Sequence, residues 1–280
     1  MIANSKRIQK RRSANAIGRI CLQLFAVLVA VATGPTAARA AADPALPSVA
    51  LRNGESLTYN VRWGLIPTVG RIKISADTLT QDDRSVLRVT TVTWTRGPAR
   101  ALFPFDARGE SVYDAKTGLL LSSSEWSTYR NKEVKDSIVF NYGKMTAEFT
   151  DDIHPEKTRT MPIPEGDPSD LILALINTRF WRITPDMARD TLVIFQDQFY
   201  PLTIRPEADP DYIFTAMGFF NTVVLVPRME KTAPKGMFKR GSTVRVWIET
   251  DDDRRLPVRF EVGFRFGTGT ASLIEYQPPK

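Results

Sequence analysis

Residues 257–266 read Pro-Val-Arg-Phe-Glu-Val-Gly-Phe-Arg-Phe, the most regular alternation in the chain. Valine or phenylalanine stands at every second position from Val258 to Phe266, with charged residues or glycine between them. Because successive side chains of a β-strand point to opposite faces, this period of two predicts a strand with one buried face. Polar residues at 251–255 predict a turn before the strand, and Gly267-Thr268-Gly269 predicts one after it.

The same period of two extends outward from this segment and predicts strands through most of the chain. Further strands are expected near residues 57–63, 72–76, 85–94, 105–113, 119–129, 134–142, 144–150, 191–195, 202–205, 221–226, 244–248 and 270–276. On one of them a carboxylate shares the apolar face; that face carries Val134, Asp136, Ile138, Phe140 and Tyr142. Short turns between about twelve strands indicate a mainly β fold, with a large antiparallel meander forming a curved sheet, half-barrel or sandwich.

One segment predicts a buried α-helix within this β-rich chain. Asp167 suits the N-cap, Pro168 suits the first helical position, and Asp170 adds negative charge in the first turn. Residues 171–176 are apolar on every side of a helical wheel, so this helix should be buried on more than one face. It is expected to end near residues 179–182, before a proline.

The domain organisation is interpreted as a spacer at 41–53 followed by one β-rich domain at 54–280. A polar connector with three prolines, residues 151–166, is the best boundary if the domain has two halves.

The formal charge of +7 comes entirely from the first forty residues. They hold seven of the 38 lysines and arginines and no acidic residue, which leaves 31 basic groups against 31 acidic ones. A chain that is otherwise neutral has no bulk attraction to nucleic acid or to an anionic membrane. A basic stretch at 231–240 is either a phosphate-contacting patch or a solvated loop, and no nucleic-acid partner is predicted.

These forty residues have the anatomy of an export signal. A basic segment precedes the apolar run 20–32, which is short for a membrane-spanning helix, and Gly34-Pro35 interrupts it. Ala38-Arg39-Ala40 has small residues where a signal peptidase cleaves, so residues 1–40 are interpreted as a signal peptide cleaved after Ala40. The mature chain is then expected in the periplasm with no transmembrane span. An uncleaved anchor and a peripheral association with a membrane remain alternatives.

Catalytic and metal-binding signals are scarce. The only cysteine, Cys21, would leave with the signal peptide, and the only histidine is His154. His154 follows Asp151 and Asp152 in a polar connector, where a metal site and an ordinary solvated loop are both conceivable. The residues contain no phosphate-binding loop and no nucleophile elbow. The sequence therefore predicts no catalytic residue, no metal site and no cofactor, and the protein is expected not to be an enzyme.

Aromatic side chains gather on the apolar strand faces. The residues concerned are Tyr59, Trp63, Phe140, Tyr142, Phe260 and Phe264. In a closed sandwich they would be ordinary core residues. In a half-open barrel they would line a cavity for an acyl chain or another apolar ligand.

Several spacings together resemble an exported bacterial family, domain of unknown function 3108. The opening motif is Gly54…Leu57-Thr58-Tyr59…Trp63…Gly70. The middle motif is Asp167-Pro168-Ser169-Asp170-Leu171 with Arg179. The closing motif is Val246-Trp247-Ile248…Asp253…Arg255-Leu256-Pro257-Val258 with Gly269 and Leu273. The resemblance covers about residues 54–276 and implies an exported, β-rich envelope protein. The family has no established activity, so no catalytic residue carries over.

The family-motif positions also have structural interpretations. They are Asp167, Arg179, Trp247, Asp253, Arg255 and Pro257. Asp167 and Arg179 would lie at the two ends of the helix dipole that favour their charges. Asp253 and Arg255 would form an ion pair that holds the turn before Pro257.

Three functions from different classes follow from the sequence. The first is a non-enzymatic envelope protein that binds an apolar or lipid-like molecule. The second is an envelope interaction or scaffold module, whose partners would be other envelope proteins. The third is an envelope hydrolase that uses two carboxylates brought together by folding. An outer-membrane barrel is disfavoured by the buried helix and the long polar connectors.

Overall fold

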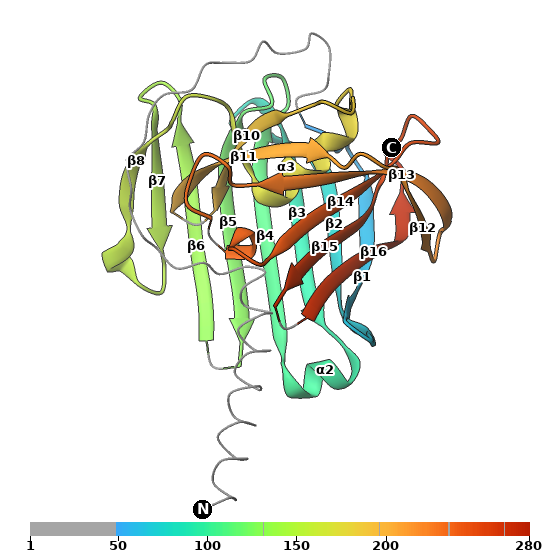
Figure 1. Cartoon of the computed structure of the whole chain (residues 1–280). Helices are drawn as coiled ribbons and strands as arrows, with labels where there is room; N and C mark the ends of the chain where they lie inside the picture. The colour runs from blue at the N-terminus through green and yellow to red at the C-terminus, as the bar shows by residue number, and fades with distance from the viewer. Residues whose placement is uncertain (1–48, 131, 196, 235, 266) are drawn as a thin grey trace, which may run out of the picture.

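The structure is a computed structural model that describes residues 49–130, 132–195, 197–234, 236–265 and 267–280. The predicted signal peptide, its cleavage site and most of the predicted spacer lie outside the described residues. Within the described residues the strands join in one 16-stranded sheet, in the order β8-β7-β6-β5-β4-β3-β2-β1-β16-β15-β14-β13-β11-β10-β9, with β12 paired to β13. The prediction of a mainly β, antiparallel, curved sheet is confirmed (Figure 1).

The first arm of the sheet is a meander of eight strands in chain order. They are β1 (Ser56–Trp63), β2 (Ile66–Gln81), β3 (Arg84–Thr95), β4 (Phe105–Asp114), β5 (Leu120–Tyr129), β6 (Lys132–Asn141), β7 (Thr146–Asp151) and β8 (Arg159–Pro162). The short helices α2 (Gly97–Leu102) and η1 (Pro155–Lys157) connect strands of this arm. Helix α2 occupies a stretch where the sequence shows no strand period.

The second arm holds the other eight strands. They are β9 (Pro168–Asp170), β10 (Arg189–Phe195), β11 (Gln198–Pro206), β12 (Asp211–Thr215), β13 (Gly218–Arg228), β14 (Thr243–Glu249), β15 (Pro257–Phe264) and β16 (Gly267–Gln277). Only β9 runs parallel to its partner, β10. The sheet therefore has sixteen strands where about twelve were expected, because β8, β9 and β12 are too short to show a period in the sequence.

Hydrogen bonds between β1 and β16, at the two ends of the folded chain, join the arms. The connector at 151–166 contains η1 and β8, and the chain then crosses to β9 at the opposite end of the strand order. The proline-containing connector thus links the two outer ends of one sheet.

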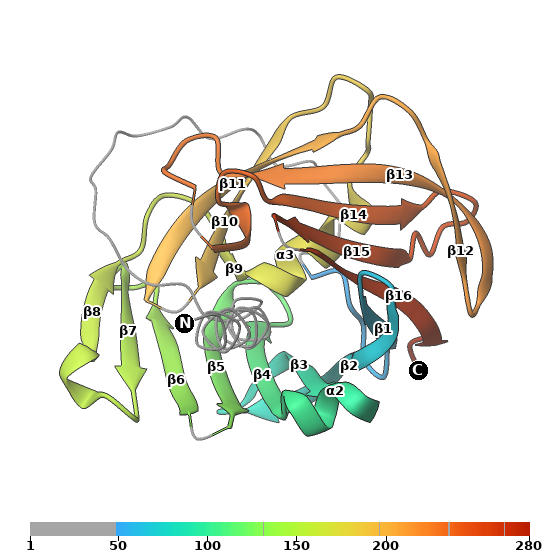
Figure 2. The same cartoon turned by 60° about the horizontal axis from the view of Figure 1, so that its bottom comes forward.

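Helix α3 (Leu171–Asn177) lies between the two arms (Figure 2) and continues into the 3₁₀ turn η2 (Thr178–Phe180); a third such turn, η3 (Gly236–Phe238), precedes β14. Leu173 to Ile176 are all buried, as the apolar sequence predicted. The predicted N-cap at Asp167 is wrong. The cap is Asp170, whose Oδ1 accepts a hydrogen bond from the Leu173 amide at 2.8 Å. Residues 168–170 pair with β10 as a strand, and that pairing delays the start of the helix.

The two arms also meet through side chains near their outer ends. Arg159 of β8 donates to the backbone oxygen of Asp197 at 2.9 Å and pairs with its carboxylate at 2.6 Å. The rings of Phe140 and Phe199 meet edge to face with centroids 6.3 Å apart. These contacts bring β6 and β8 against the β10–β11 hairpin, so the sheet curls around α3. None of the helices in the described part of the chain has the length and apolar character to cross a membrane.

Candidate functional site

A row of side chains crosses the first arm at one level. Direct cross-strand neighbours in this row are Thr91 of β3, Gly109 of β4, Glu125 of β5, Asp136 of β6 and Asp151 of β7. Residues directly opposite one another share a face of the sheet, with Cβ atoms about 5 Å apart. The register therefore aligns three carboxylates on consecutive strands.

A cavity of about 100 Å³ lies over this row, between the first arm and α3. On the sheet side its lining combines polar residues, including Glu125 and Asp136, with the apolar Val89, Ala107, Ile138 and Phe149. On the other side it is mainly apolar, with Leu171 and Ile172 from α3 and Phe195 from β10, and Asp170 of β9 is its one charged residue. An apolar wall facing a few convergent polar groups is the usual composition of a small-molecule site.

Gly109 helps to keep this space open. It also lines the cavity, directly opposite Glu125. A Cβ added at Gly109 would meet only the backbone oxygen of Ser124, at 3.9 Å. The backbone thus tolerates a side chain at this position, and its absence leaves room beside Glu125.

Two polar atoms in the cavity lining lack partners. Glu125 Oε1 and Thr93 Oγ1 are both sealed from solvent and form no hydrogen bond. A buried polar atom without a partner costs about 1–3 kcal/mol, and nearly all such atoms in folded proteins are paired. Two of them in one cavity indicate a place where a hydrogen-bonding ligand would be stabilised.

The environment of this carboxylate pair raises the pKa of both groups. Burial, together with the charge of Asp136, raises the pKa of Glu125 to about 8. Burial raises the pKa of Asp136 to about 7, and the charges of Asp151, Asp197 and Asp152 add to the effect. Because the two groups interact, they titrate as a pair. Around neutral pH the pair holds a proton that it can donate or share, which is unusual for carboxyl groups.

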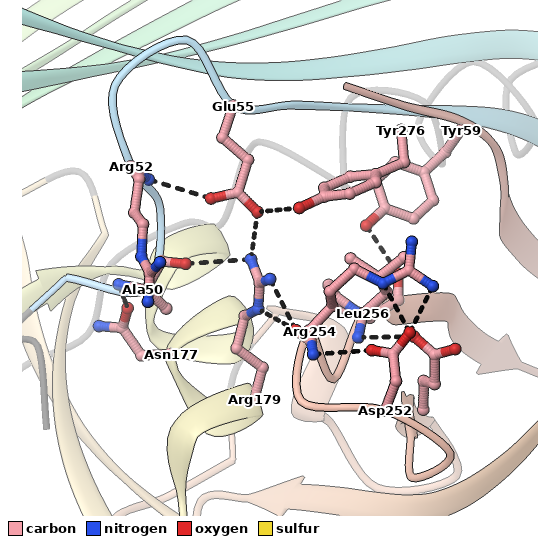
Figure 3. A network of polar contacts seen from close by, with 12 residues as sticks. Ala50, Arg52, Glu55, Tyr59, Asn177, Arg179, Asp252, Arg254, Leu256 and Tyr276 are labelled. Carbon is pink, nitrogen blue, oxygen red and sulfur yellow. Dashed lines mark hydrogen bonds and ion pairs between the residues drawn. The ribbon is translucent and has the colours of Figure 1, made fainter. Parts of the chain in front are cut away.

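A second buried carboxylate has the opposite surroundings (Figure 3). Glu55 and Arg179 are 2% and 3% exposed, and Arg179 Nη1 lies 2.7 Å from Glu55 Oε1. Glu55 also accepts hydrogen bonds from the Arg52 amide at 3.0 Å and the Tyr276 hydroxyl at 3.1 Å. Every oxygen of this carboxylate is paired.

Arg179 connects two further segments through the same guanidinium (Figure 3). It donates to the backbone oxygen of Ala50 at 3.1 Å and twice to that of Arg254, at 2.9 and 2.6 Å. The network thus joins the start of the described chain, η2 and the β14–β15 turn. Since its charged groups are buried and mutually satisfied, the network acts as a structural tie.

The six aromatic residues singled out in the sequence lie in ring pairs. The pairs and their centroid distances are Tyr59–Phe260 at 5.3 Å, Trp63–Phe264 at 6.1 Å and Phe140–Tyr142 at 6.0 Å. Tyr59 is fully buried, and its hydroxyl donates to the backbone oxygen of Pro257 at 2.8 Å. None of the six is among the residues lining the cavity over Glu125. Their contacts are those of packed strand faces.

The turn was expected to hold an ion pair between Asp253 and Arg255, but the adjacent residues Asp252 and Arg254 form the pair instead. Arg254 Nε donates to Asp252 Oδ2 at 2.6 Å and holds the turn. Arg255 instead adopts a left-handed backbone conformation, with φ of 47°, and its buried Nε has no partner. Burial lowers the pKa of Arg255.

The remaining motif positions also have structural contacts. Trp247 Nε1 donates to Asp211 Oδ2 at 2.8 Å, and the Arg259 guanidinium lies 5.8 Å from the centroid of the Trp247 ring. Pro257 begins β15 and accepts the Tyr59 hydroxyl. Asp167 is exposed just before β9. None of these residues lines the cavity.

The structure brings together two acids that the sequence interpretation did not name as a site. Asp136 was visible as a carboxylate on an otherwise apolar strand face. Glu125 carried no such signal, because Ser123 and Ser127, its neighbours on the same strand face, are not apolar. The pair that the hydrolase hypothesis requires is therefore present, although its members emerge only from the register. Within the described residues no three histidine, cysteine or acidic side chains are grouped as metal ligands.

Comparison with known proteins places the chain in a family without a known activity. The family described as "Protein of unknown function (DUF3108)" matches residues 58–274. A β-barrel-like protein of domain of unknown function DUF1849 from Brucella abortus is similar in structure, with a TM-score of 0.52 and 8% identity over 82% of this chain and 100% of that one. A candidate lipoprotein from Parabacteroides distasonis aligns over 82% and 98% of the two chains at 9% identity, but its TM-score is 0.30. No curated protein matches the chain. At such low identity the first structure supports the fold alone.

Proposed function

The chain belongs to the DUF3108 family of proteins of unknown function, and from its geometry we propose that it is a non-enzymatic binding protein of the cell envelope. Its ligand would be an apolar or lipid-like molecule held against α3. The observation that carries the proposal is the cavity between α3 and the first arm, with an apolar wall on one side and unpaired polar atoms on the other.

The size of the cavity limits how the ligand would bind. Since one water occupies about 30 Å³ in the liquid, a cavity of about 100 Å³ holds only a few heavy atoms. We propose that it receives one end of a longer molecule. The rest of the molecule would follow the apolar residues Leu171, Ile172 and Phe195 out of the cavity.

The proposed location rests on the first forty residues. Their basic start, apolar run and small-residue cleavage motif support export to the periplasm. Secretion assays with residues 1–40 fused to a periplasm-dependent reporter test this part of the proposal. A fusion that stays in the cytoplasm would contradict it.

The binding proposal is tested by purifying the protein from the periplasm and analysing extracted lipids by mass spectrometry. Gly109→Val is the diagnostic variant, because the new side chain would occupy the cavity while its Cβ meets only one backbone oxygen at 3.9 Å. Overfilling a site typically costs about 1–3 kcal/mol, so the bound molecule should decrease roughly 5- to 150-fold. Gly143→Ala, outside the cavity lining, is the control.

Two outcomes would refute the binding proposal. One is wild-type protein that carries no apolar molecule and acquires none from added lipid extract. The other is a Gly109→Val variant that folds normally and retains the molecule at the wild-type level.

A specific observation also supports the carboxylate hydrolase as a second candidate. Glu125 and Asp136 face each other in the register, with pKa values raised to about 8 and about 7. A protonated acid beside a carboxylate is the arrangement used in general acid–base catalysis. Turnover of chromogenic glycosides or esters that disappears in both Glu125→Gln and Asp136→Asn would favour it. A broad panel without turnover would count against it.

We also propose a peripheral association with the membrane through the β12–β13 hairpin. Tyr212, Phe214 and Phe219 are 61%, 74% and 63% exposed, and residues 212–221 contain no charge. Aromatic side chains favour the membrane interface, so this face suits a bilayer surface. Phe214→Ser with Phe219→Ser should reduce flotation with phosphatidylglycerol–phosphatidylethanolamine vesicles. Val139→Ser, at an exposed apolar residue of β6, is the control, and unchanged flotation of the double variant would refute the proposal.

A further inference from the structure

The carboxylate pair lacks the partners that a buried negative charge normally has. Asp151, at the end of the row, lies 3.9 Å from both Lys157 and His154. Among the described residues, Glu125 and Asp136 form no ion pair, and Glu125 Oε1 accepts no hydrogen bond. A buried carboxylate is stabilised by a paired cation and by hydrogen-bond donors; this partly buried pair has no cation in the described part of the chain, and its sealed oxygen, Glu125 Oε1, has no donor there.

The surroundings of the pair are acidic on several sides. The neighbouring strands β3 and β4 contribute uncharged residues to the cavity, including Thr91, Thr93, Gly109 and Ser111. Asp170 of β9 lines it as well, and the carboxylates of Asp151, Asp152 and Asp197 raise the pKa of Asp136. Each of the last three has a cationic partner: Asp151 pairs with Lys157, Asp152 with Lys135 and Asp197 with Arg159. The cation missing at the pair is therefore not supplied by any of these elements.

The shape and polarity of the cavity limit which chemical group of a ligand would bind beside the carboxylate pair. A cation with several N–H donors would satisfy the two facing carboxyl groups together. The adjacent apolar wall, with Leu171, Ile172 and Phe195, suits carbon atoms attached to that cation. Within the described residues the acids form no metal-ligand group. A primary ammonium on an apolar chain has both properties.

We propose that the cavity recognises the primary ammonium group of its ligand, with Glu125 and Asp136 accepting its N–H hydrogen bonds and α3 contacting its carbon chain. The inference rests on the proposed binding function and names the head group of the bound molecule. An amine-bearing lipid and a soluble polyamine both present this group. The apolar wall makes the lipid-like source the expected one.

Binding should strengthen as the pH rises. The pKa values of about 7 for Asp136 and about 8 for Glu125 mean that both groups become anionic between pH 6 and pH 9. An alkylammonium with a pKa near that of lysine, about 10.4, remains cationic over the same range. Attraction between them therefore develops as the pH increases, whereas carboxylates with ordinary pKa values would already be ionised at pH 6 and would give a nearly constant attraction over this range.

The test is isothermal titration at pH 8.5 with decylammonium, decanol and spermidine, each below its aggregation concentration. Decylammonium should bind at least about tenfold more tightly than decanol, as expected for a charge-assisted hydrogen bond, and more tightly than spermidine. The variant Glu125→Gln with Asp136→Asn should lose this preference while still binding both ten-carbon probes. Glu148→Gln, at an exposed residue of β7, should keep it.

The outcomes separate this inference from the proposed function. Equal binding of decylammonium and decanol by the wild type would overturn the ammonium inference and leave the apolar binding site intact. Tighter binding of spermidine than of decylammonium would overturn the lipid-like source. If none of the probes binds, both proposals fail. A preference for decylammonium that survives in the double variant would place the recognition elsewhere.

Discussion

Glu125→Gln should stabilise the protein, and increasingly so at higher pH. The carboxyl group has an ordinary pKa of 4.5 in the unfolded chain and a pKa of about 8 in the fold. Between these values the folded state binds more protons than the unfolded state, so stability falls as the pH rises. Glutamine keeps the shape of the side chain and stays neutral at every pH, which removes this loss.

The size of the effect follows from the two pKa values. At pH 5 the carboxyl group is largely protonated in the fold, and the pH lies only about half a unit above the pKa of the group in the unfolded chain. Glu125 therefore lowers the stability of the fold by under about 1 kcal/mol at this pH. At pH 9 it is ionised in both states, and the difference between pKa 4.5 and about 8 amounts to about 4–5 kcal/mol. The advantage of Glu125→Gln over the wild type should therefore grow by about 4 kcal/mol between pH 5 and pH 9.

Urea unfolding at pH 5, 7 and 9 measures this difference. Asp136 titrates in the same range and interacts with Glu125, so the difference between the two proteins reports the loss of Glu125 from the coupled pair. Glu148→Gln on the exposed side of β7 controls for the loss of one negative charge. If Glu125→Gln is no more stable than the wild type at pH 9, Glu125 is not a buried, uncompensated acid and the description of the cavity is wrong.

Two further predictions concern the structural elements around the cavity. Arg179→Met should lose about 3–5 kcal/mol of unfolding free energy, because it leaves Glu55 buried without its cation. Adding Glu55→Gln should restore part of that loss in urea unfolding, and a single-variant loss below about 1 kcal/mol would contradict the structural tie. Asp170→Ala should lower the unfolding free energy by about 2–3 kcal/mol, because it removes two contacts. One is the cap of α3, and the other is the acceptor of the Tyr113 hydroxyl, which lies 2.7 Å from Asp170 Oδ2. Asp167→Ala should change stability by less than about 0.5 kcal/mol, and equal losses at the two positions would refute the cap assignment.

The long strands were predictable because each repeats its period of two several times. Residues 85–94 and 105–113 were expected as strands, and β3 and β4 extend these ranges by only one or two residues. In contrast, β9 has three residues and β8 has four. So few residues cannot establish a period, and only their pairing with neighbouring strands makes them strands.

The start of α3 shows how tertiary structure decides between local signals. Asp167 and Asp170 are both good N-cap residues, and Pro168 favours a helix that starts after Asp167. The fold instead pairs residues 168–170 with β10, and the Tyr113 hydroxyl holds the Asp170 carboxylate at 2.7 Å. Neither contact can be deduced from the segment itself, since Tyr113 lies 57 residues away.

The site was only partly predictable for a related reason. Asp136 was recognisable because it interrupts an apolar strand face. Its partner Glu125 depends on the register between β5 and β6, and a shift of one residue would place Glu125 on the opposite face of the sheet. A hydrophobic pattern fixes which face of each strand is buried, but the neighbours of Glu125 on its own face of β5 are Ser123 and Ser127 rather than apolar residues. The site therefore lies where the sequence pattern is weakest.

The same fold treats the fully buried Glu55 and the partly buried Glu125 in opposite ways, and the contrast gives the ammonium inference a thermodynamic consequence. Arg179 neutralises Glu55 at 2.7 Å, whereas Glu125 faces Asp136 and has an oxygen without a partner. A ligand ammonium in the cavity would neutralise the charge of Glu125, as Arg179 neutralises the charge of Glu55. Since a ligand that binds only the folded state stabilises it, saturating decylammonium should raise the unfolding midpoint of the wild type at pH 8.5. Glu125→Gln should start from a higher midpoint and gain less, because the charge that the ammonium compensates is already absent.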